Sequence, residues 1–376
     1  MRYPNAYPGI MTVPETVEIN LTGKCNLHCR YCYYNESMEK ASDLSTDKWL
    51  GFFEELGSIG VRKVRLSGGE PFIRKDFFIL VDSIIKNKMR YSILTNGTLI
   101  DDLKLAEFAK GKRRLRLDSI QISIDGSKAE IHDKSRPPQS FDKALQNLRL
   151  LKQHNFPVTV RVTINRHNFD DLENIATLLI DDVGLDGFST NEADYQGSAR
   201  CQGQDIILTV EERKQAMASL VALNKKYDGR VSAQAGPLAR ASMMEEVNER
   251  IARGEKNMPG RGKLCSCGGV FTKIAVLHDG TFVPCDMLPN LVMGRIGETS
   301  LEEAWQTHPN INLVRERRKI PLSELEECRD CPYSGFCTGG CPGSVMAKTG
   351  KLNGIDPLVC YRRYLEEEAH LNATLN

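Results

Sequence analysis

The chain has 376 residues, of which 41% are hydrophobic and 26% charged, and its formal net charge at pH 7 is +1. This near-neutral balance gives no global electrostatic reason to expect binding to nucleic acid or to a membrane. No apolar run approaches the roughly 18 residues of a membrane span, and the first residues lack the apolar core of a signal peptide. We therefore expect a cytoplasmic protein.

Short strand-like runs alternate with helical segments from residue 16 to about residue 226. Alternating apolar residues predict strands within six runs: TVEINLT (16–22), KVRLSGG (63–69), YSILTNG (91–97), SIQISIDG (119–126), VTVRVTIN (158–165) and DGFSTNEA (186–193). Helical spacing follows them at 45–60, 77–85, 101–110, 140–154, 170–183 and 209–227. Because no hairpin signal separates the runs, we expect parallel strands joined by right-handed crossovers. Six such units predict an α/β fold, a partial (β/α)6 TIM barrel with its active site at the carboxyl ends of the strands.

The character of the sequence changes after residue 228. We predict an N-terminal extension over 1–15, the barrel over 16–228, a linker or helical segment over 229–263 and a small cysteine-rich domain over 264–376. The last segment holds eight of the twelve cysteines, is rich in glycine and has few periodic elements. Such a segment does not build a core alone, so we expect metal sites to stabilise its fold.

Three cysteines lie close together in KCNLHCRYCYY, residues 24–34, directly after the first predicted strand. Cys25, Cys29 and Cys32 form a C-x3-C-x2-C pattern in a loop, where three thiolates are free to converge on one cluster. In a reducing compartment, cysteines favour metal ligation or redox chemistry over disulfides. A zinc knuckle is the alternative, but it needs a fourth ligand, and His28 sits awkwardly between two of the cysteines. Three thiolates on a [4Fe–4S] cluster leave one iron free to bind another group.

The cysteine motif, together with SGGEP (67–71) after the second strand, resembles the radical S-adenosylmethionine (SAM) superfamily. In that family the open iron chelates the methionine moiety of SAM, and reductive cleavage of SAM yields a 5′-deoxyadenosyl radical. The resemblance implies cofactor contacts from Tyr31 (adenine), Gly68, Gly69 and Glu70 (methionine amino group), Ser123 and Asp125 (ribose), Arg136 (methionine carboxylate) and Asn96 (same pocket). Glycines let the backbone approach a ligand, and an acidic residue pairs with an ammonium group. For the last four residues, an ordinary role in a turn or at a strand end is the alternative.

The C-terminal cysteines have a spacing of their own, C-x2-C-x5-C-x3-C over residues 328–341. This segment resembles the SPASM extension of radical SAM enzymes, which carries two auxiliary [4Fe–4S] clusters, for three clusters in all. By similarity the ligands of the first auxiliary cluster are Cys267, Cys285 and Cys341, with the role of Cys265 as a fourth ligand left open. Those of the second are Cys328, Cys331, Cys337 and Cys360. A zinc ribbon is the alternative, and Cys201 remains as an ordinary thiol.

Asp286 directly follows Cys285 and matches an aspartate that is the catalytic base in sulfatase-maturing relatives. A helix cap or a turn is the alternative role for this residue. Glu192, Asp194 and Tyr195 follow the sixth predicted strand and are candidate substrate contacts at the mouth of the barrel.

The resemblance implies a radical SAM/SPASM oxidoreductase that modifies a ribosomally made peptide or protein by crosslinking, thioether formation or side-chain oxidation. The expected partners are the peptide or protein substrate and an electron donor such as flavodoxin or ferredoxin, with no nucleic acid and no membrane. Because 24 residues precede Cys25, we expect leader binding to use the barrel surface or a separate leader-peptide-binding protein.

Four other functions are compatible with some of these sequence features. A sulfatase-type maturase that forms formylglycine is favoured by Asp286. A small-molecule dehydrogenase acting on a sugar or a haem precursor shares all the cluster motifs. A non-enzymatic iron–sulfur electron carrier has no need of SGGEP, Ser123 or Arg136. A zinc-stabilised binding protein would be colourless and indifferent to oxygen.

Overall fold

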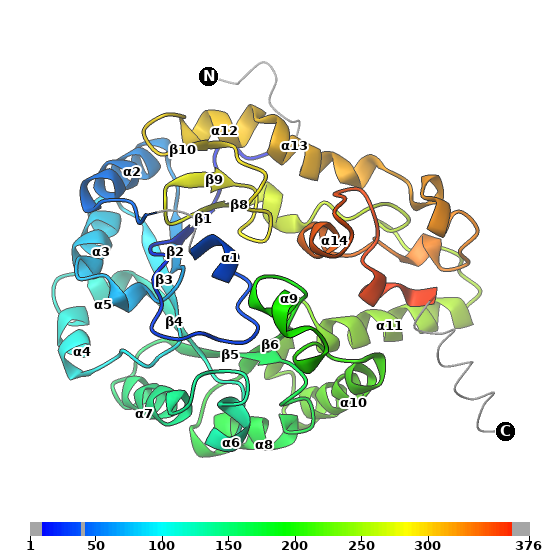
Figure 1. Ribbon diagram of the computed structural model, residues 1–376, viewed down its shortest axis with the longest axis horizontal. Helices are drawn as coiled ribbons and strands as arrows, with labels where there is room; N and C mark the ends of the chain where they lie inside the picture. The colour runs from blue at the N-terminus through cyan, green and yellow to red at the C-terminus, as the bar shows by residue number, and fades with distance from the viewer. Residues whose placement is uncertain (1–9, 39–41, 363–376) are drawn as a thin grey trace.

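The computed structural model describes residues 10–38 and 42–362. Most of the predicted extension over 1–15, and the chain after residue 362, lie outside the described residues. A curved sheet of parallel strands forms the framework (Figure 1). Seven strands follow in chain order: β1 (Thr16–Asn20), β2 (Lys63–Ser67), β3 (Arg90–Thr95), β4 (Leu117–Ser123), β5 (Val158–Ile164), β6 (Phe188–Glu192) and β7 (Val231–Ala233). The first six confirm the predicted partial barrel, whereas β7 was not predicted.

Helices connect these strands and cover the outer face of the sheet (Figure 1). They are α2 (Thr46–Ile59), α3 (Phe77–Lys86), α4 (Asp102–Phe108), α5 (Arg113–Arg116), α6 (Ala129–His132), α7 (Ser140–Gln153), α8 (Leu172–Ala176) and α10 (Val210–Lys226). The helix predicted over 170–183 begins as α8 and widens into a π-helical turn over Thr177–Asp182. None of the described helices combines the length and apolar character needed to cross a bilayer.

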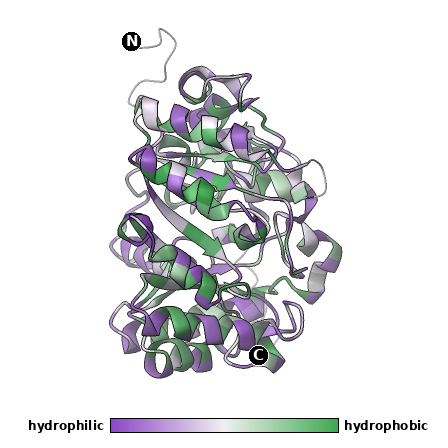
Figure 2. Cartoon of the chain, turned by 90° about the vertical axis from the view of Figure 1, so that its left-hand side faces the viewer, coloured by the Kyte–Doolittle hydropathy of each residue, from purple (hydrophilic) through white to green (hydrophobic). Residues whose placement is uncertain are grey.

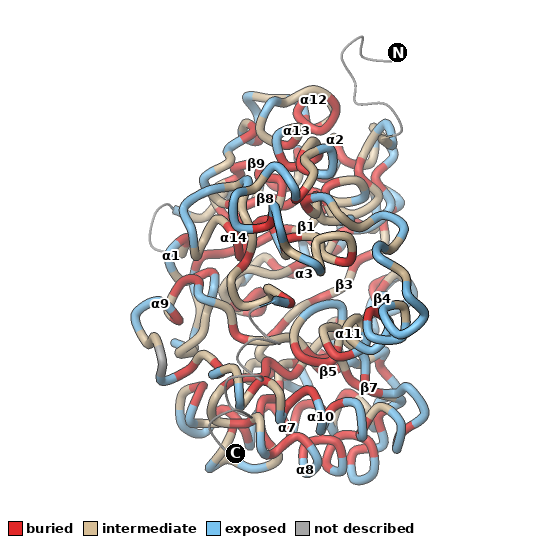
Figure 3. The backbone as a smooth tube through the Cα atoms, turned by 90° about the vertical axis from the view of Figure 1, so that its right-hand side faces the viewer, coloured by how far each residue is buried: buried red, intermediate tan, exposed pale blue. Residues whose placement is uncertain are grey.

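The main core lies between the sheet and this layer of helices. Alternate strand residues such as Ile19, Leu66 and Ile93 are fully buried and pack against helix residues such as Trp49 and Leu80. The helices on that side carry both hydrophilic and hydrophobic residues, as amphipathic helices do (Figure 2). Buried residues concentrate in the strands and in the helix faces that meet them (Figure 3).

The inner face of the sheet is polar. Because side chains alternate along a strand, the residues between the buried apolar ones point into the barrel. These inward residues are half-buried and include Glu18, Arg65, Ser92, Gln121, Arg161 and Ser189. The sequence therefore builds an apolar outer layer and a hydrophilic interior below the carboxyl ends of the strands.

The C-terminal part continues the same sheet. Strand β8 (Lys273–Val276) pairs in parallel with β1, with Thr16 opposite Lys273, and β9 (Thr281–Val283) and β10 (Gly294–Arg295) follow antiparallel. These short strands lie in a segment that we expected to have few periodic elements. The remaining helices are α11 (Pro237–Ala252), α12 (Leu301–Thr307), α13 (Pro309–Glu316) and α14 (Pro342–Thr349). In Figure 1, α12 continues the outer layer of helices beside β10, whereas α11, α13 and α14 lie toward the open side of the barrel.

Candidate active site

The three cysteines of the N-terminal motif lie in the loop between β1 and α1 (Asn35–Met38), at the carboxyl end of the sheet. Backbone hydrogen bonds fasten this loop to segments that follow other strands. They run from Leu21 N–H to Ser67 O, from Arg30 N–H to Ser135 O and from Ser198 N–H to Cys32 O, each 2.9 Å long. The loop is thus held in place by the barrel from three directions.

The thiols of Cys25, Cys29 and Cys32 share one largely buried space. Burial, with smaller contributions from the neighbouring cysteines, raises the pKa of Cys25 to about 11 and that of Cys29 to about 12. Nitrogen donors approach two of the sulfurs: Leu27 N–H at 3.4 Å and Asn96 Nδ2 at 4.0 Å from Cys25 Sγ, and Arg136 Nη1 at 3.7 Å from Cys29 Sγ. All twelve cysteines are free of disulfides. Three neighbouring thiols with nitrogen donors around them are a donor set that fits an iron–sulfur cluster held by thiolates, and no three ligand side chains among the described residues are already placed around a metal site.

The SGGEP segment packs its two glycines against the backbone of the cysteine loop. Gly68 has a φ of +120°, and a Cβ there would lie 2.5 Å from the Thr22 carbonyl oxygen. A Cβ on Gly69 would lie 2.1 Å from the Lys24 carbonyl oxygen. The amides of Gly69 and Glu70 donate to these two oxygens at 2.8 Å. The glycines thus allow the end of β2 to lie directly under the loop, and their contact with SAM stays a prediction.

We expect Gly69→Ala to lower the free energy of unfolding by roughly 1–3 kcal/mol, because the added methyl group collides with backbone that has no room to move. Iron uptake should fall with it, since the cysteine loop is displaced. Gly51→Ala is the matched control, because a Cβ at that position on α2 meets nothing within 4 Å. Denaturant unfolding and iron analysis of both variants check this, and equal stability of the two would contradict it.

Glu70 is fully buried and joins β2 to β3. Its carboxylate accepts hydrogen bonds from Phe72 N–H at 3.2 Å, from the Thr95 hydroxyl at 2.8 Å and from Asn96 N–H at 2.9 Å. Burial raises the pKa of Glu70 to about 7. The Glu70 carboxylate therefore holds the ends of β2 and β3 together in this structure. Its pairing with the methionine ammonium group of SAM stays a prediction.

Tyr31, Asp125 and Arg136 form a buried cluster beside the cysteine loop. The Tyr31 hydroxyl donates to Asp125 Oδ2, and Arg136 Nε lies 2.5 Å from the same oxygen. The other oxygen, Oδ1, accepts from Thr163 N–H on β5 at 2.7 Å. The Arg136 guanidinium also lies over the Tyr31 ring, 5.4 Å from its centre. The structure thus brings together three predicted SAM contacts, with Asp125 fully buried at their centre.

The other two predicted SAM contacts lie on the same rim. Ser123 is the last residue of β4 and is half-buried. Asn96 directly follows β3, and its Nδ2 donates to Asn26 Oδ1 at 3.0 Å within the cysteine loop. The eight predicted SAM contacts therefore lie in the cysteine loop or at and after the carboxyl ends of β2, β3 and β4, while their individual roles stay predictions.

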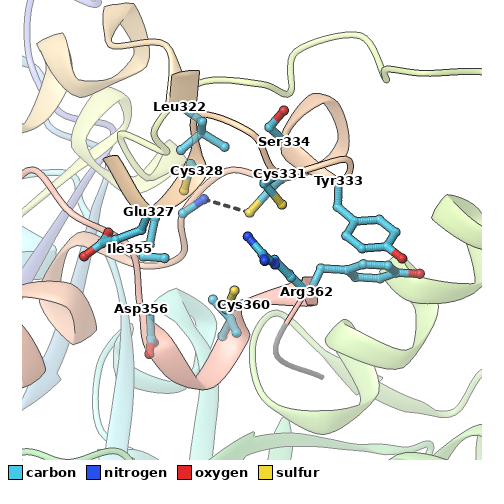
Figure 4. Close-up of a pocket in the computed structure, with 14 residues that line it drawn as sticks. Leu322, Glu327, Cys328, Cys331, Tyr333, Ser334, Ile355, Asp356, Cys360 and Arg362 are labelled. Atoms are coloured by element: carbon cyan, nitrogen blue, oxygen red, sulfur yellow. Dashed lines mark hydrogen bonds between the residues drawn. The ribbon is translucent and has the colours of Figure 1, made fainter. Parts of the chain in front are cut away.

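Four C-terminal cysteines surround one pocket beyond the open side of the barrel (Figure 4). They are the four predicted ligands of the second auxiliary cluster, Cys328, Cys331, Cys337 and Cys360. Burial, followed by the charges of the three other cysteines, raises the pKa of Cys328 to about 11. Gly339 N–H donates to Cys337 Sγ at 3.3 Å. This donor set fits a cluster held by four thiolates.

The other four C-terminal cysteines form a second group between this pocket and the barrel. Cys285 and Cys341 interact electrostatically with each other, as do Cys341 and Cys267. Cys267 N–H donates to Cys265 Sγ at 3.1 Å, and the charges of Cys265, Cys341 and Cys267 all act on the Arg317 guanidinium. Burial raises the pKa of both Cys285 and Cys341. Cys265 thus lies near the same arginine as Cys267 and Cys341, and its role as a fourth ligand stays a prediction.

Asp286 lies in a pocket of about 80 Å³ between the cysteine loop and α14. Its carboxylate accepts a 2.7 Å hydrogen bond from the Tyr33 hydroxyl. Burial raises the pKa of Asp286, the charge of Glu18 raises it further, and Lys273 opposes both. Asp286 therefore lies between Cys285 of the first auxiliary cysteine group and the charged residues Glu18 and Lys273 inside the barrel. A base at this position would meet a substrate that enters the barrel.

Sequence reasoning missed two features of this pocket. No role for Tyr33 was predicted, yet its hydroxyl binds Asp286 and the residue is 40% exposed. Gln196 also lines the pocket; it is 5% exposed, and its Nε2 has no hydrogen-bond partner among the described residues. No spacing in the sequence indicates Gln196, because it lies in the loop after β6 and reaches the pocket through the fold alone.

Two of the three candidate substrate contacts after the sixth strand bind other parts of the chain instead, whereas Tyr195 is 40% exposed. Glu192 forms an ion pair with Arg213 at 2.6 Å. Asp194 lies 2.6 Å from Lys348 Nζ and accepts a hydrogen bond from the Ser344 hydroxyl, both on α14. They fasten the barrel rim to α10 and α14, so they support the walls of the site.

Comparison with known proteins agrees with this arrangement. The radical SAM superfamily matches residues 19–179, and the SPASM iron–sulfur cluster-binding domain matches residues 265–332. The chain contains a radical SAM domain and an SPASM domain. The structure of Streptococcus suis SuiB bound to precursor peptide SuiA is similar, with a TM-score of 0.69 and 16% identity over 94% of this chain and 77% of that one. Native anSMEcpe with bound AdoMet has a TM-score of 0.68 and 20% identity over 93% of this chain and 96% of that one.

The protein is thus a radical SAM enzyme whose cofactors are S-adenosyl-L-methionine and [4Fe–4S] clusters. When bound, the cluster and SAM would together supply the radical chemistry of the reaction. The thiols of Cys25, Cys29 and Cys32 would hold the cluster of the radical SAM domain. The two C-terminal cysteine groups would hold those of the SPASM domain. The rest of this chain orients the reactants and shields them from water.

Proposed function

We propose that this enzyme oxidatively modifies a side chain of a ribosomally made peptide or protein. The observation that carries the proposal is the pocket that holds Asp286, Tyr33 and Gln196 between the two domains. The unpaired Gln196 amide matches a peptide carbonyl, because a buried donor without a partner costs free energy until a ligand satisfies it. The similar folds of SuiB with precursor peptide SuiA and of anSMEcpe with the Cp18Cys peptide support a peptide substrate.

The proposed roles follow the position of each residue. Tyr31, Arg136 and Ser123 would orient SAM at the rim of the barrel, together with the SGGEP segment. Asp286 would accept the proton that the substrate loses as it is oxidised, since it lies between the barrel interior and Cys285. The SPASM clusters would take up the electron left on the substrate. Flavodoxin or ferredoxin is our proposed electron donor, and a separate leader-binding protein is a further proposed partner.

The test is to incubate the reduced enzyme with SAM and a peptide encoded beside its gene. We expect 5′-deoxyadenosine, and a peptide that has lost two hydrogen atoms through a crosslink, a thioether or another oxidation. A reaction without reductant is the control. Deoxyadenosine formation without any change in candidate peptides, but with oxidation of a sugar or haem precursor, would contradict the proposal.

A second candidate function is the conversion of a cysteine or serine side chain to formylglycine. Asp286 favours it, because a base at this position matches the sulfatase-type maturase. The two functions differ in their products, since formylglycine is an aldehyde that reacts with a hydrazide probe. Labelling of the product peptide by that probe would favour formylglycine over a crosslink.

A further inference from the structure

The interior of the barrel holds a group of charged residues below the cysteine loop. Glu18 on β1 lies at its centre, with Oε1 2.6 Å from Arg65 Nη1 on β2 and 2.9 Å from Lys273 Nζ on β8. A single carboxylate therefore serves two cations. Both cations therefore have Glu18 as a counter-charge, and the three side chains together carry a net charge of +1.

Arg161 adds a third cation from the opposite wall. Its neighbours on β5, Val160 and Val162, are fully buried under the helices, so the Arg161 side chain points inward. The positive charge of Arg65 lowers the pKa of Arg161, as burial does to a larger extent. Strands β3 and β4 separate β5 from β2 in the sheet. The charges of Arg65 and Arg161 therefore interact across the interior of the barrel rather than between neighbouring strands.

Arg161 has no carboxylate partner among the described residues. Its one hydrogen bond is from Nη1 to the Thr190 carbonyl oxygen, at 3.4 Å. A half-buried guanidinium with five donors and one long contact keeps donors open to a ligand. Arg65, by contrast, has Glu18 within hydrogen-bond distance. Of these inward cations, Arg65 and Lys273 are paired with Glu18, and Arg161 is not.

We propose that Arg161 forms a carboxylate-binding subsite inside the barrel, where an acidic side chain or the C-terminal carboxylate of the substrate binds. The planar guanidinium matches a carboxylate in a two-point contact, and partial burial strengthens that contact. This inference rests on the proposed function, since it names the chemistry of the substrate that enters from the pocket of Asp286. It makes Arg161 a residue that determines specificity.

A carboxylate also occurs in the methionine moiety of SAM, and this second source has to be separated from the first. Ser123, a predicted SAM contact, lies opposite Arg161 in the register of β4 and β5. Arg136 is the residue predicted to bind the methionine carboxylate, and it lies on the rim near Cys29. We therefore assign the methionine carboxylate to Arg136 and the substrate carboxylate to Arg161.

The test uses two small probes and the full-length, cluster-loaded enzyme saturated with SAM. The probes are N-acetylglutamate methylamide and its glutamine counterpart, which have the same shape but differ in charge. We expect calorimetry to show at least about tenfold tighter binding of the acid, as a charge-assisted pair in a partly buried site provides. Equal affinities, or no saturable binding of the acid, would overturn the inference.

Variants identify the residue and the source of the carboxylate. Arg161→Gln should abolish the preference for the acid, Arg161→Lys should keep part of it, and Arg149→Gln, on the exposed face of α7, should leave it unchanged. SAM affinity should be the same in the wild type and in Arg161→Gln. If SAM affinity falls and the probe preference stays, Arg161 binds the methionine carboxylate and the inference is wrong.

The outcome is separable from that of the proposed function. A peptide that is oxidised by an enzyme with no preference between the probes would leave the proposed function standing and remove the subsite. An Arg161-dependent preference in an enzyme that modifies no peptide would do the reverse.

Discussion

Cys29→Ala is expected to abolish the formation of 5′-deoxyadenosine, with the rate falling to that of SAM without enzyme. The proposed cluster has three thiolate ligands, so the loss of one leaves two sulfurs, too few to retain it. The C-terminal cysteine groups are untouched by this change. Iron should therefore fall by about four atoms from about twelve per chain, while most of the brown colour remains.

Cys201→Ala is the control for this variant, because Cys201 is an exposed thiol on α9 (Ser198–Gln202), outside all three groups. It should retain both iron content and deoxyadenosine formation. Chromatography of the products and iron analysis after anaerobic reconstitution measure both quantities. Deoxyadenosine from Cys29→Ala above the level without enzyme would show that the proposed chemistry is wrong, and stoichiometric zinc in place of iron would do the same.

Asp286→Asn should reduce oxidation of the substrate by about 10²–10⁴-fold, the usual contribution of a positioned base. Formation of 5′-deoxyadenosine should persist, because Asp286 lies beyond Tyr33 rather than among the three N-terminal thiols. Asparagine still accepts the Tyr33 hydrogen bond, so the pocket keeps its shape. The expected result is therefore SAM cleavage that is uncoupled from product formation.

Two further variants separate a base from a turn residue. Tyr33→Phe removes the hydrogen bond to Asp286 but not its carboxylate, so we expect a smaller loss of product. Asp182→Asn, on the exposed outer surface, should behave like the wild type. The ratio of product to deoxyadenosine measures all three variants. A normal ratio in Asp286→Asn would show that this aspartate serves only the turn after Cys285.

The barrel could be predicted because the residue pattern within each segment indicates a strand or a helix. Each of the six strands pairs a buried apolar stripe with the polar inward residues that line the interior, and each is followed by helical spacing. The hairpin of β8 and β9 was missed, although Asp279-Gly280 between two apolar runs is a strong hairpin signal. The density of glycine and cysteine around it suggested a segment without strands.

The spacing of the C-terminal cysteines in the sequence does not indicate which of them lie together in the fold. Cys337 and Cys341 are four residues apart, yet they belong to different groups. Gly339 and Gly340 separate them, and both have positive φ, +70° and +88°, so the backbone reverses there. The resemblance implies this grouping, whereas the residue spacing alone would place both cysteines together. Tyr33, Gln196 and Arg161 likewise acquire their neighbours only through long-range packing.

The pairing of β1 with β8 joins two strands that lie far apart in the sequence. Strand β1 completes its hydrogen bonds only when β8, about 250 residues later in the chain, has been made, as the pairing of Thr16 with Lys273 shows. Until then β1 has an open edge, which is a site for mispairing and aggregation. A chain truncated before β8 would keep that edge permanently, so the two domains should not be separable into independently soluble pieces.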